Sequence, residues 1–416
     1  MFKLFYSLSI KIYYVLIAFA SLFNKKAKLW IKGRKKIFKK IDVLKKVNDK
    51  KIWFHSSSLG EFEQARPLIE KIKTQYPNYK IIVTFFSPSG YEFRKNYKFA
   101  DYIFYLPIDS NRNAKKFIEA LNPSITFFVK YDFWYFYIRE LHKKQIPTYL
   151  VSGIFRQNQI FFKPYGKAYA KILKNFTHLF VQNEKSTELL KSIEITNSTI
   201  AGDTRFDRVI EIADNSQENE LIKKFVNDKF CIIAGSSWYE DEQLLSRFIN
   251  EHPDVKMIIA PHVINENHIV NILQIIHVPV VRYSRAKLEN VGEYSVMIID
   301  NIGMLAGLYK YGNLAYIGGG FGAGIHNIIE AAVYGMPVIF GTNYKKFQEA
   351  LDLIELKAAY PIADYDELSH YLSMFIRDAN FLKHVSEIAY NYVRKNKGAT
   401  DKILAAIDFD TKPPSI

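Results

Sequence analysis

Residues 51–75 read KIWFHSSSLGEFEQARPLIEKIKTQ, and this stretch sets the fold expected for the whole chain. The first five residues are a short run rich in apolar and aromatic side chains, which is typical of a buried strand. A loop of serines and one glycine follows, and apolar residues then recur at helical spacing as far as residue 75. A strand, a loop and a helix in this order form the repeating unit of a parallel α/β sheet.

The same alternation continues along the chain on both sides of one polar segment. Before that segment, helices are predicted at residues 61–75 and 111–121, and strands at residues 51–55, 80–85, 102–106, 125–129 and 148–151. After it, strands are predicted at residues 230–234, 256–260, 296–300, 314–317 and 337–340. A chain of 416 residues is long enough for two domains. We therefore predict an α/β protein with doubly wound parallel sheets: an N-terminal domain over 52–212, a linker over 213–228 and a C-terminal domain over 229–416.

The net charge of +15 is concentrated near the start of the chain. Residues 24–51 contain 13 Lys or Arg and two acidic residues, whereas the chain beyond residue 51 is close to neutral. A basic patch confined beside an apolar segment argues against nucleic-acid binding and favours an anionic membrane surface as partner. The lone Cys231 excludes an internal disulfide and suits a reducing cytoplasm.

Residues 1–23 are unusually apolar and, at about 20 residues, long enough to cross a bilayer. Tyr6, Tyr13 and Tyr14 beside Lys11 also suit a helix that lies in the membrane interface. A buried helix followed by a solvated basic helix is the structural alternative. We predict a membrane anchor over 1–23, a basic juxtamembrane segment over 24–51, and catalytic domains that face the cytoplasm.

Loops that follow strands carry the functional predictions, because ligands of parallel sheets bind outside the carboxyl ends of the strands. In the loop that opens the helix at residue 61, Ser57, Ser58 and Gly60 allow a close backbone approach to an anion. Glu61 is a candidate general base in the first helical turn. Its structural alternative is a helix-terminal charge whose pKa is lowered by the helix dipole. His55 is expected to be a packed residue at the strand end.

A glycine-rich loop, GGGFGAG at residues 318–324, follows a predicted strand, and a helix is predicted to begin around His326. The amides of Gly319 and Gly320 are candidates for surrounding a phosphate. The loop fits neither the dinucleotide fingerprint nor a P-loop, because the helix begins after the glycines and no Gly-Lys-Ser/Thr follows. Asn327 and Glu330, three residues apart, suit contact with the sugar or phosphate of a nucleotide. A purely structural loop is the alternative.

Three further loops follow predicted strands of the second half. They are Gly235-Ser236-Ser237, a candidate anion site, then Pro261-His262, and then Asp300-Asn301-Ile302-Gly303-Met304-Leu305. Each alone is as well explained by ordinary turn chemistry. Together they place polar and glycine-rich loops along one sheet edge, as in a nucleotide pocket.

Four motifs, in their order along the chain, resemble the family of 3-deoxy-D-manno-octulosonic acid (Kdo) transferases of lipopolysaccharide biosynthesis. They are Ser58-Leu59-Gly60-Glu61, Ser87-Pro88-Ser89-Gly90, Leu106-Pro107-Ile108-Asp109 and Gly202-Asp203-Thr204-Arg205-Phe206-Asp207. The glycine loop through Glu330 resembles a fifth family motif. The similarity extends over nearly the whole chain, including the apolar start.

The resemblance implies a GT-B fold of two Rossmann-like domains that face a cleft, with CMP-Kdo as donor and a lipid A precursor as acceptor. It implies transfer with inversion at the inner membrane. Carried over by position, Glu61 is the proton acceptor and Arg205 stabilises the transition state in place of the family's lysine. The implied CMP-binding residues are Pro261, His262, Ile302, Gly303, Met304, Asn327, Ile328, Ile329 and Glu330.

Two motifs depart from the family pattern. The segment Lys130-Tyr131-Asp132-Phe133-Trp134 has Lys130 where the family has a glutamate, so Lys130 and Asp132 are both candidate stabilisers. In Pro261-His262-Val263, the family's arginine after the proline is missing; Arg282 or Arg285 is a candidate to replace it.

In the implied reaction the leaving group departs with a negatively charged phosphate. Stabilising that anion is therefore the main electrostatic task of the active site.

No cluster of His and carboxylates has the spacing of metal ligands, so catalysis is expected to need neither a metal nor a cofactor. Two other functions stay open. One is a different GT-B transferase that uses a UDP-sugar on a lipid acceptor. The other is a non-catalytic nucleotide- or lipid-binding membrane protein, which would have no need of Glu61.

Overall fold

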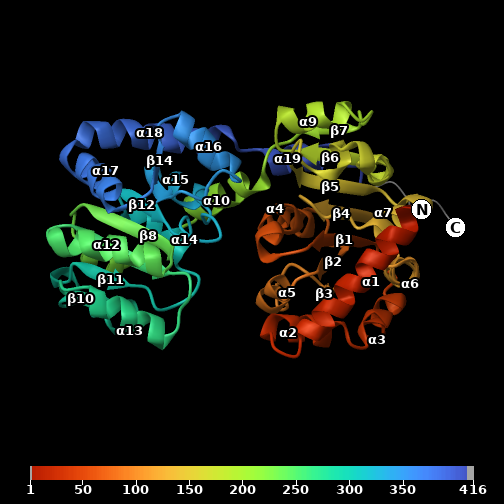
Figure 1. Cartoon of the computed structure of the whole chain (residues 1–416), viewed down its shortest axis with the longest axis horizontal. Helices are drawn as coiled ribbons and strands as arrows, with labels where there is room; N and C mark the ends of the chain where they lie inside the picture. Colours follow the sequence, from red (N-terminus) through yellow and green to blue (C-terminus); the bar gives the residue numbers. More distant parts are fainter. Residues whose placement is uncertain (1, 410–416) are drawn as a thin grey trace. The chain divides into compact units, whose positions relative to one another are not determined.

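The computed structural model describes residues 2–409 and divides into two compact units. Unit 1 contains the chain up to Arg208 and again from Gly398, and unit 2 is Val209–Lys397. Each unit contains a seven-stranded sheet in which all the paired strands run parallel. The α/β class with two wound sheets is therefore confirmed (Figure 1).

Unit 1 begins with three helices and then alternates strands with helices. The helices are α1 (Phe2–Ala20), α2 (Lys25–Arg34), α3 (Ile37–Ile41), α4 (Leu59–Gln75), α5 (Pro88–Arg94), α6 (Asn111–Leu121), α7 (Tyr135–Lys143), α8 (Lys167–Ala170), α9 (Glu184–Lys191) and the start of α10 (Thr204–Asp214). The strands are β1 (Lys51–Ser56), β2 (Lys80–Phe85), β3 (Tyr102–Tyr105), β4 (Ile125–Val129), β5 (Thr148–Gly153), β6 (His178–Val181) and β7 (Ser198–Ile200), paired in the order β3-β2-β1-β4-β5-β6-β7.

Alternate residues of these strands build two cores, one on each face of the sheet. In β1, Trp53 joins a cluster formed mainly with α3, α6 and α7, whereas Ile52 and Phe54 join a cluster formed with α4. Both faces are covered, so the strands are nearly continuous apolar runs. This is why residues 80–85 and 125–129 could be recognised from sequence as β2 and β4 with the correct bounds.

Unit 2 repeats the architecture with its own sheet, ordered β10-β11-β9-β8-β12-β13-β14. Its strands are β8 (Cys231–Ser237), β9 (Lys256–Pro261), β10 (Val280–Arg282), β11 (Val296–Ile298), β12 (Leu314–Ile317), β13 (Val338–Gly341) and β14 (Ala359–Ile362). Its helices are α11 (Glu220–Val226), α12 (Tyr239–Glu251), α13 (Glu266–Ile275), α14 (Leu305–Leu308), α15 (Ile329–Ala332), α16 (Gln348–Glu355), α17 (Tyr365–Arg377) and α18 (Ala379–Lys395).

The division between the units differs from the predicted linker at 213–228. The first crossing lies within α10, between Arg208 and Val209, and residues 220–226 of the predicted linker form α11. The chain also returns to unit 1, where α19 (Ala399–Ala405) and the following residues pack on the α4 face of the sheet through Ile403, Ile407 and Phe409. Residues 398–409 of the predicted domain 229–416 therefore belong to unit 1, because their apolar side chains complete that core.

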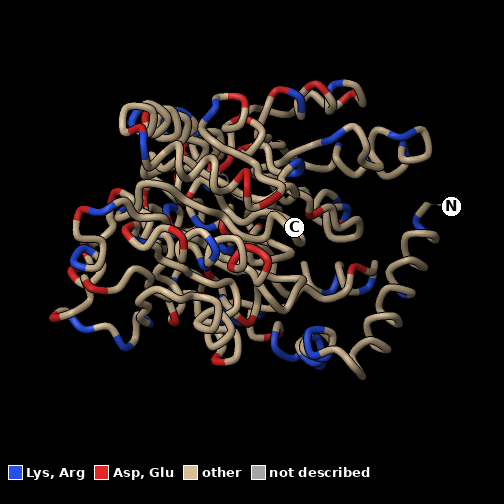
Figure 2. Tube along the Cα trace, turned by 60° about the vertical axis from the view of Figure 1, so that its left-hand side comes forward, with Lys and Arg blue, Asp and Glu red and all other residues tan. Residues whose placement is uncertain are grey.

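Helix α1 is long and apolar enough to cross a membrane, and within residues 2–409 no other helix meets those criteria. It runs along the surface of unit 1 from beside α7 to α2 (Figure 1). One side contacts the unit: the Tyr6 hydroxyl donates to Asp109 Oδ2 at 2.6 Å, and the Tyr13 ring lies against Phe86. The remainder exposes apolar side chains, namely Leu4, Phe5, Leu8, Ile12, Val15, Leu16 and Phe19. In Figure 2 the helix is almost entirely tan, with Lys and Arg gathered at its far end, where α2 follows.

Candidate active site

In both sheets, many of the predicted site residues lie near the point where the strand order reverses. In unit 1, β1 is paired with β2 on one side and with β4 on the other, and in unit 2, β8 is paired with β9 and β12. At such a reversal the flanking loops leave the sheet toward opposite faces, which opens a crevice at the carboxyl ends of the strands. The loops after β1 and β4, and those after β8 and β12, hold most of the predicted site residues.

Glu61 occupies the first turn of α4 and forms a capping box with Ser58. The amide of Ser58 donates to Glu61 Oε2 at 2.8 Å, and the amide of Glu61 donates to Ser58 Oγ at 3.4 Å. Glu61 therefore caps the N-terminus of α4, as expected if its role were structural. Its pKa, however, is raised from its ordinary value, mainly because the side chain is withdrawn from water. Burial thus outweighs the helix terminus, and the pKa is not lowered as the structural alternative supposes.

Asp132, in the loop between β4 and α7, lies close enough to Glu61 for the two carboxylates to repel. Burial and then the charge of Glu61 raise the pKa of Asp132 well above its usual range. Both the amide and the hydroxyl of Ser57 donate to Asp132, the amide at 2.8 Å. Ser57, predicted to bind an anion of a ligand, is therefore bound to a carboxylate of the protein itself.

Positive charge comes to the same place from Lys130, which directly follows β4. Its backbone is left-handed, with φ 58°, which is uncommon for a residue other than glycine and turns the chain sharply at the strand end. The charge of Lys130 lowers the pKa values of Glu61 and Asp203 relative to burial alone. Arg156, which sequence reasoning missed, lies near the Tyr131 ring, 5.7 Å from its centroid.

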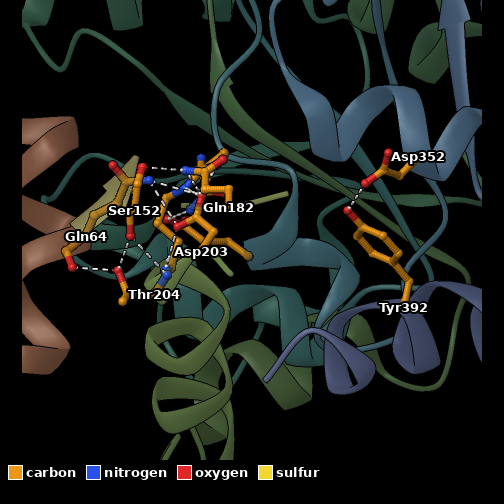
Figure 3. Close-up of polar contacts among 10 residues, drawn as sticks. Gln64, Ser152, Gln182, Asp203, Thr204, Asp352 and Tyr392 are labelled. Atoms are coloured by element: carbon orange, nitrogen blue, oxygen red, sulfur yellow. Dashed lines mark hydrogen bonds and ion pairs between the residues drawn. The ribbon is translucent and has the colours of Figure 1, made fainter. Parts of the chain in front are cut away.

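Arg205, at the start of α10, is held by Asp203. Its Nε and Nη2 donate to Asp203 Oδ2 at 2.9 and 2.8 Å. Gln64 of α4 and Gln182, which follows β6, donate to the same carboxylate at 3.0 and 3.1 Å (Figure 3). Burial on its own would raise the pKa of Asp203, but Arg205 lowers it below its ordinary value. Three of these residues, Gln64, Gln182 and Asp203, were not predicted as site residues. For Asp203 the sequence did contain a signal, because it belongs to the same Gly202–Asp207 motif as Arg205.

His55 is fully buried at the end of β1, as predicted for a packed residue. Its Nδ1 lies 2.8 Å from Thr84 Oγ1, and burial lowers its pKa to about 3. Its Nε2 is 3.8 Å from Asp132 Oδ2. The ring is therefore neutral at physiological pH and forms part of the wall behind Asp132.

In unit 2, the glycine loop after β12 packs closely on neighbouring backbone. A Cβ on Gly320 would come within 2.4 Å of the Gly341 amide nitrogen, and Gly319 has φ +89°. The amide of Gly319 donates to Asp241 Oδ2 at 3.0 Å. Asp241 also accepts from the Tyr316 hydroxyl at 2.7 Å. At Gly319 and Gly320 the glycines thus serve the folding of the loop, which favours the structural alternative for these two positions.

The Gly235-Ser236-Ser237 segment, predicted as a loop, instead forms the end of β8 and is likewise held by the protein. Gly235 lies against the hydroxyl of Tyr309, Ser236 has φ 55°, and the Ser237 hydroxyl donates to Glu242 Oε1 at 2.9 Å. Its anion-binding role stays a prediction.

Three rings stack beside the glycine loop. His262 stacks with both Trp238 and His326, with ring centroids 4.6 and 4.5 Å apart, and the Trp238 indole N–H points to His326 Nε2 at 3.2 Å. Burial, together with the charge of His262, lowers the pKa of His326 to about 4. His262 was predicted from the resemblance, whereas Trp238 and His326 were not. A flat aromatic surface of this kind can stack with a nucleobase.

The end of the glycine loop differs in one respect from the prediction. The helix begins at Ile329 rather than around His326, so Asn327 precedes it. Asn327 still meets Glu330, donating from Nδ2 to Oε1 at 2.9 Å, while its Oδ1 is buried and has no hydrogen-bond partner among residues 2–409. Ile328 and Ile329 are core residues, so any contact with a ligand would be through their backbone.

The remaining predicted CMP-binding residues lie at two strand ends of unit 2. Pro261 is the last residue of β9. Ile302, in the loop after β11, is 81% exposed, and Gly303 has φ +97° with open space around its Cα; Met304 immediately precedes α14. Arg282, a candidate replacement for the missing arginine, is paired with Glu266 at 2.8 Å. Among residues 2–409, no three His, Cys, Asp or Glu side chains are grouped as metal ligands, and independence from metal stays a prediction.

Comparison with known proteins relates the chain to one enzyme family. The family model described as 3-deoxy-D-manno-octulosonic-acid transferase (kdotransferase) matches residues 31–208. The 3-deoxy-D-manno-octulosonic acid transferase of Rickettsia bellii is 27% identical, over 98% of this chain and 99% of that protein. The enzyme of the same name from Aquifex aeolicus is 26% identical, over 74% of this chain and 80% of that protein.

Solved structures support the fold. A putative UDP-N-acetylglucosamine 2-epimerase from Listeria monocytogenes superposes with a TM-score of 0.62 at 13% identity, covering 88% of this chain and 99% of that one. MurG from Acinetobacter baumannii superposes with a TM-score of 0.54 at 12% identity, covering 86% and 99%. These neighbours agree with the GT-B class implied by the sequence motifs. In its motifs and along nearly its whole length, the chain is therefore similar to 3-deoxy-D-manno-octulosonic acid transferases, which are glycosyltransferases.

Proposed function

We propose that this chain transfers Kdo from CMP-Kdo to a lipid A precursor in lipopolysaccharide biosynthesis, with inversion and with Glu61 as general base. The observation that carries the proposal is the position of Glu61 at the strand-order reversal of unit 1. There it lies within the electrostatic reach of Lys130 and next to the buried carboxylate of Asp132. A carboxylate whose pKa is raised by burial is better suited to accept a proton near neutral pH.

In the proposed reaction, an acceptor hydroxyl attacks the anomeric carbon of Kdo and its proton passes to Glu61. The bond between that carbon and the phosphate oxygen breaks, and CMP leaves with the bonding electrons. Attack from the face opposite the leaving group inverts the configuration in a single displacement. Ser58 keeps one oxygen of Glu61 bound, since its amide donates to Oε2, and this leaves Oε1 for the incoming hydroxyl.

Arg205 and Lys130 are proposed to stabilise the negative charge of the sugar carboxylate and of the transition state. Arg205 is oriented by Asp203, which engages its Nε and Nη2 and fixes the plane of the guanidinium. Fixing a cation in advance avoids reorganisation at the moment of reaction. Lys130 replaces a carboxylate of the family pattern, so the site of this chain is more positive than the family pattern implies.

Unit 2 is proposed to bind CMP. His262 presents its ring in a stack with Trp238, which suits the cytosine base. Asn327 and Glu330 are joined to each other and are proposed to contact the ribose, with the buried Asn327 Oδ1 as an acceptor for a hydroxyl. The loop at Ile302-Gly303-Met304 supplies further backbone contacts, and no cofactor is proposed.

The enzyme is proposed to act at the inner membrane with both units in the cytoplasm. An acyl-chain acceptor stays in the bilayer, so the exposed apolar side chains of α1 would keep the enzyme beside it. The Lys- and Arg-rich segment that follows α1 would add attraction to the anionic leaflet.

The test is incubation with CMP-Kdo and a detergent-dispersed lipid A precursor, followed by mass spectrometry of the lipid. Wild-type protein should add Kdo, and Glu61→Gln should lower the rate by roughly 10²–10⁴-fold while CMP binding persists. The matched control is Glu63→Gln, two residues further along the same helix, where the carboxylate pairs with Arg66 at 2.8 Å. Near-normal transfer by Glu61→Gln would refute the assignment of the base. Transfer from a UDP-sugar instead, or CMP binding without any transfer, would support the alternative functions.

A further inference from the structure

A cavity of about 630 Å³ lies where α1, α2 and α3 meet the loop that follows β3. Tyr14 of α1 forms one wall and Asn113 at the start of α6 forms another. The turn between α2 and α3 supplies Lys35, Lys36 and Lys39. None of the predicted catalytic or CMP-binding residues lines this cavity.

The lining of the cavity is strongly positive. It contains three exposed lysines and a buried arginine, and no Asp or Glu is among the lining residues. In the part of the chain that the structure describes, Lys35, Lys36 and Lys39 form no ion pair with a carboxylate. Like charges gathered without a counter-ion repel one another. An anionic ligand would relieve that repulsion.

The backbone holds these lysines in place. Lys36 has a left-handed conformation, with φ 56°, where residues other than glycine are uncommon. Arg34, the preceding wall residue, anchors the end of α2 by donating to the carbonyls of Leu106 at 2.9 Å and Phe86 at 2.7 Å. Its guanidinium also lies 3.9 Å from the Trp30 ring centroid. The cavity is therefore built on a fixed scaffold, and an unusual backbone conformation at a charged turn is a common mark of a binding site.

The cavity adjoins the surface of α1 that faces solvent. Tyr14 lines the cavity and is itself 41% exposed, and Val15 beside it is exposed as well. An amphipathic helix in the membrane interface places its apolar side chains at the level of the acyl chains, with polar groups beside it at the level of the headgroups. A basic cavity at the flank of such a helix lies at headgroup depth.

We propose that this cavity binds the phosphate of an anionic membrane lipid, with Lys35, Lys36 and Lys39 as its ligands and α1 in the interface beside it. The inference rests on the proposed membrane association and adds a specific headgroup site to it. We assign the phosphate to a lipid in the bilayer, because the exposed apolar side chains of α1 would contact the acyl chains of a lipid but have no role for a free ion.

The test compares two double variants in vesicle flotation with the full-length chain and no sugar donor. Lys36→Gln with Lys39→Gln removes two cavity charges, and Lys25→Gln with Lys28→Gln removes two charges of α2 that do not line the cavity. Diffuse attraction predicts the same loss for both, at about fivefold per lysine. A headgroup site predicts a further loss of roughly tenfold for the cavity variant, because charge-assisted hydrogen bonds are lost as well. This additional loss of binding by the cavity variant should appear with vesicles that contain phosphatidylglycerol and disappear with pure phosphatidylcholine.

Equal losses in the two double variants would overturn the proposal, as would equal binding of wild-type protein to both kinds of vesicle. Tight binding of inorganic phosphate without vesicles, lost in Lys36→Gln with Lys39→Gln, would show a free-phosphate site and would also contradict it. Circular dichroism of each variant checks that the fold is kept, and Lys36→Arg should retain binding. Because the assay contains no donor, its failure is separate from a failure of sugar transfer.

Discussion

Replacing Asp203 by asparagine should destabilise unit 1 by about 2–4 kcal/mol. The carboxylate accepts from Gln64 and Gln182 and from the amide, Nε and Nη2 of Arg205. An asparagine in either orientation turns its NH₂ group toward at least one of these donors. Removing one partner of a buried ion pair costs about 3–5 kcal/mol, and the lower range is used because the Arg205 side chain is 18% exposed.

Urea unfolding followed by tryptophan fluorescence measures this change. Trp30, Trp53 and Trp134 belong to unit 1, and Trp238→Phe removes the only tryptophan of unit 2. In that background the fluorescence reports unit 1, so its transition can be treated separately from the rest of the chain. The control is Glu194→Gln, which breaks an exposed pair with Lys174 and should change stability by less than about 1 kcal/mol.

The pH dependence gives a second check on Asp203. Its pKa in the folded protein is below its ordinary value, so the ionised carboxylate stabilises the fold above the unfolded pKa of about 3.9. That contribution is lost only as the pH falls from there through the folded pKa. The difference between wild type and Asp203→Asn should therefore be equal at pH 7 and pH 5 and should shrink in stronger acid. A loss below about 1 kcal/mol at pH 7, or one that shrinks well above pH 4, would refute the reasoning.

Three further outcomes are expected. Lys130→Gln should move the acid limb of the transfer rate to higher pH, because the lysine charge lowers the pKa of Glu61; an unmoved midpoint would contradict this. Tyr6→Phe removes a 2.6 Å bond to the buried Asp109 and should cost about 1.5–3 kcal/mol in urea unfolding. Gly320→Ala should cost about 1–3 kcal/mol in the unfolding of unit 2, since its Cβ would meet a backbone nitrogen at 2.4 Å.

The central strands of each sheet could be predicted because they are buried on both faces. Residues 314–317 form β12 with the predicted bounds. Four of the described strands were not predicted, namely β6, β7, β10 and β14, and all but β6 lie at sheet edges. The strands β7 and β10 are only three residues long, and β7 is mostly exposed. Strands so short give no run of apolar residues, and they form because neighbouring strands offer a paired edge. The polar segment 213–228 was predicted to be a linker although it contains α11. That helix buries only Ile222 and Phe225, so its sequence shows little of the apolar pattern of a packed helix.

The site could be predicted in part from the rule that loops after parallel strands gather at one edge. That rule brings Glu61 and Asp132 together, although 71 positions separate them. It does not reveal Gln64, which reads as an ordinary helical polar residue until its partner Asp203, 139 positions away, is known. Trp238 was missed similarly, because its stacking on His262 depends on two loops that only the fold brings together.

The return of the chain to unit 1 has a consequence for the order of events at the ribosome. Ile403, Ile407 and Phe409 fill a core whose other members were made before residue 202. Translation proceeds at about 5–20 residues per second. The last side chains of this core are therefore synthesised roughly 10–40 s after the others. The first unit therefore finishes folding only after residues 209–397 of the second unit have been synthesised. A nascent chain stalled in the second unit would carry an unfinished first one.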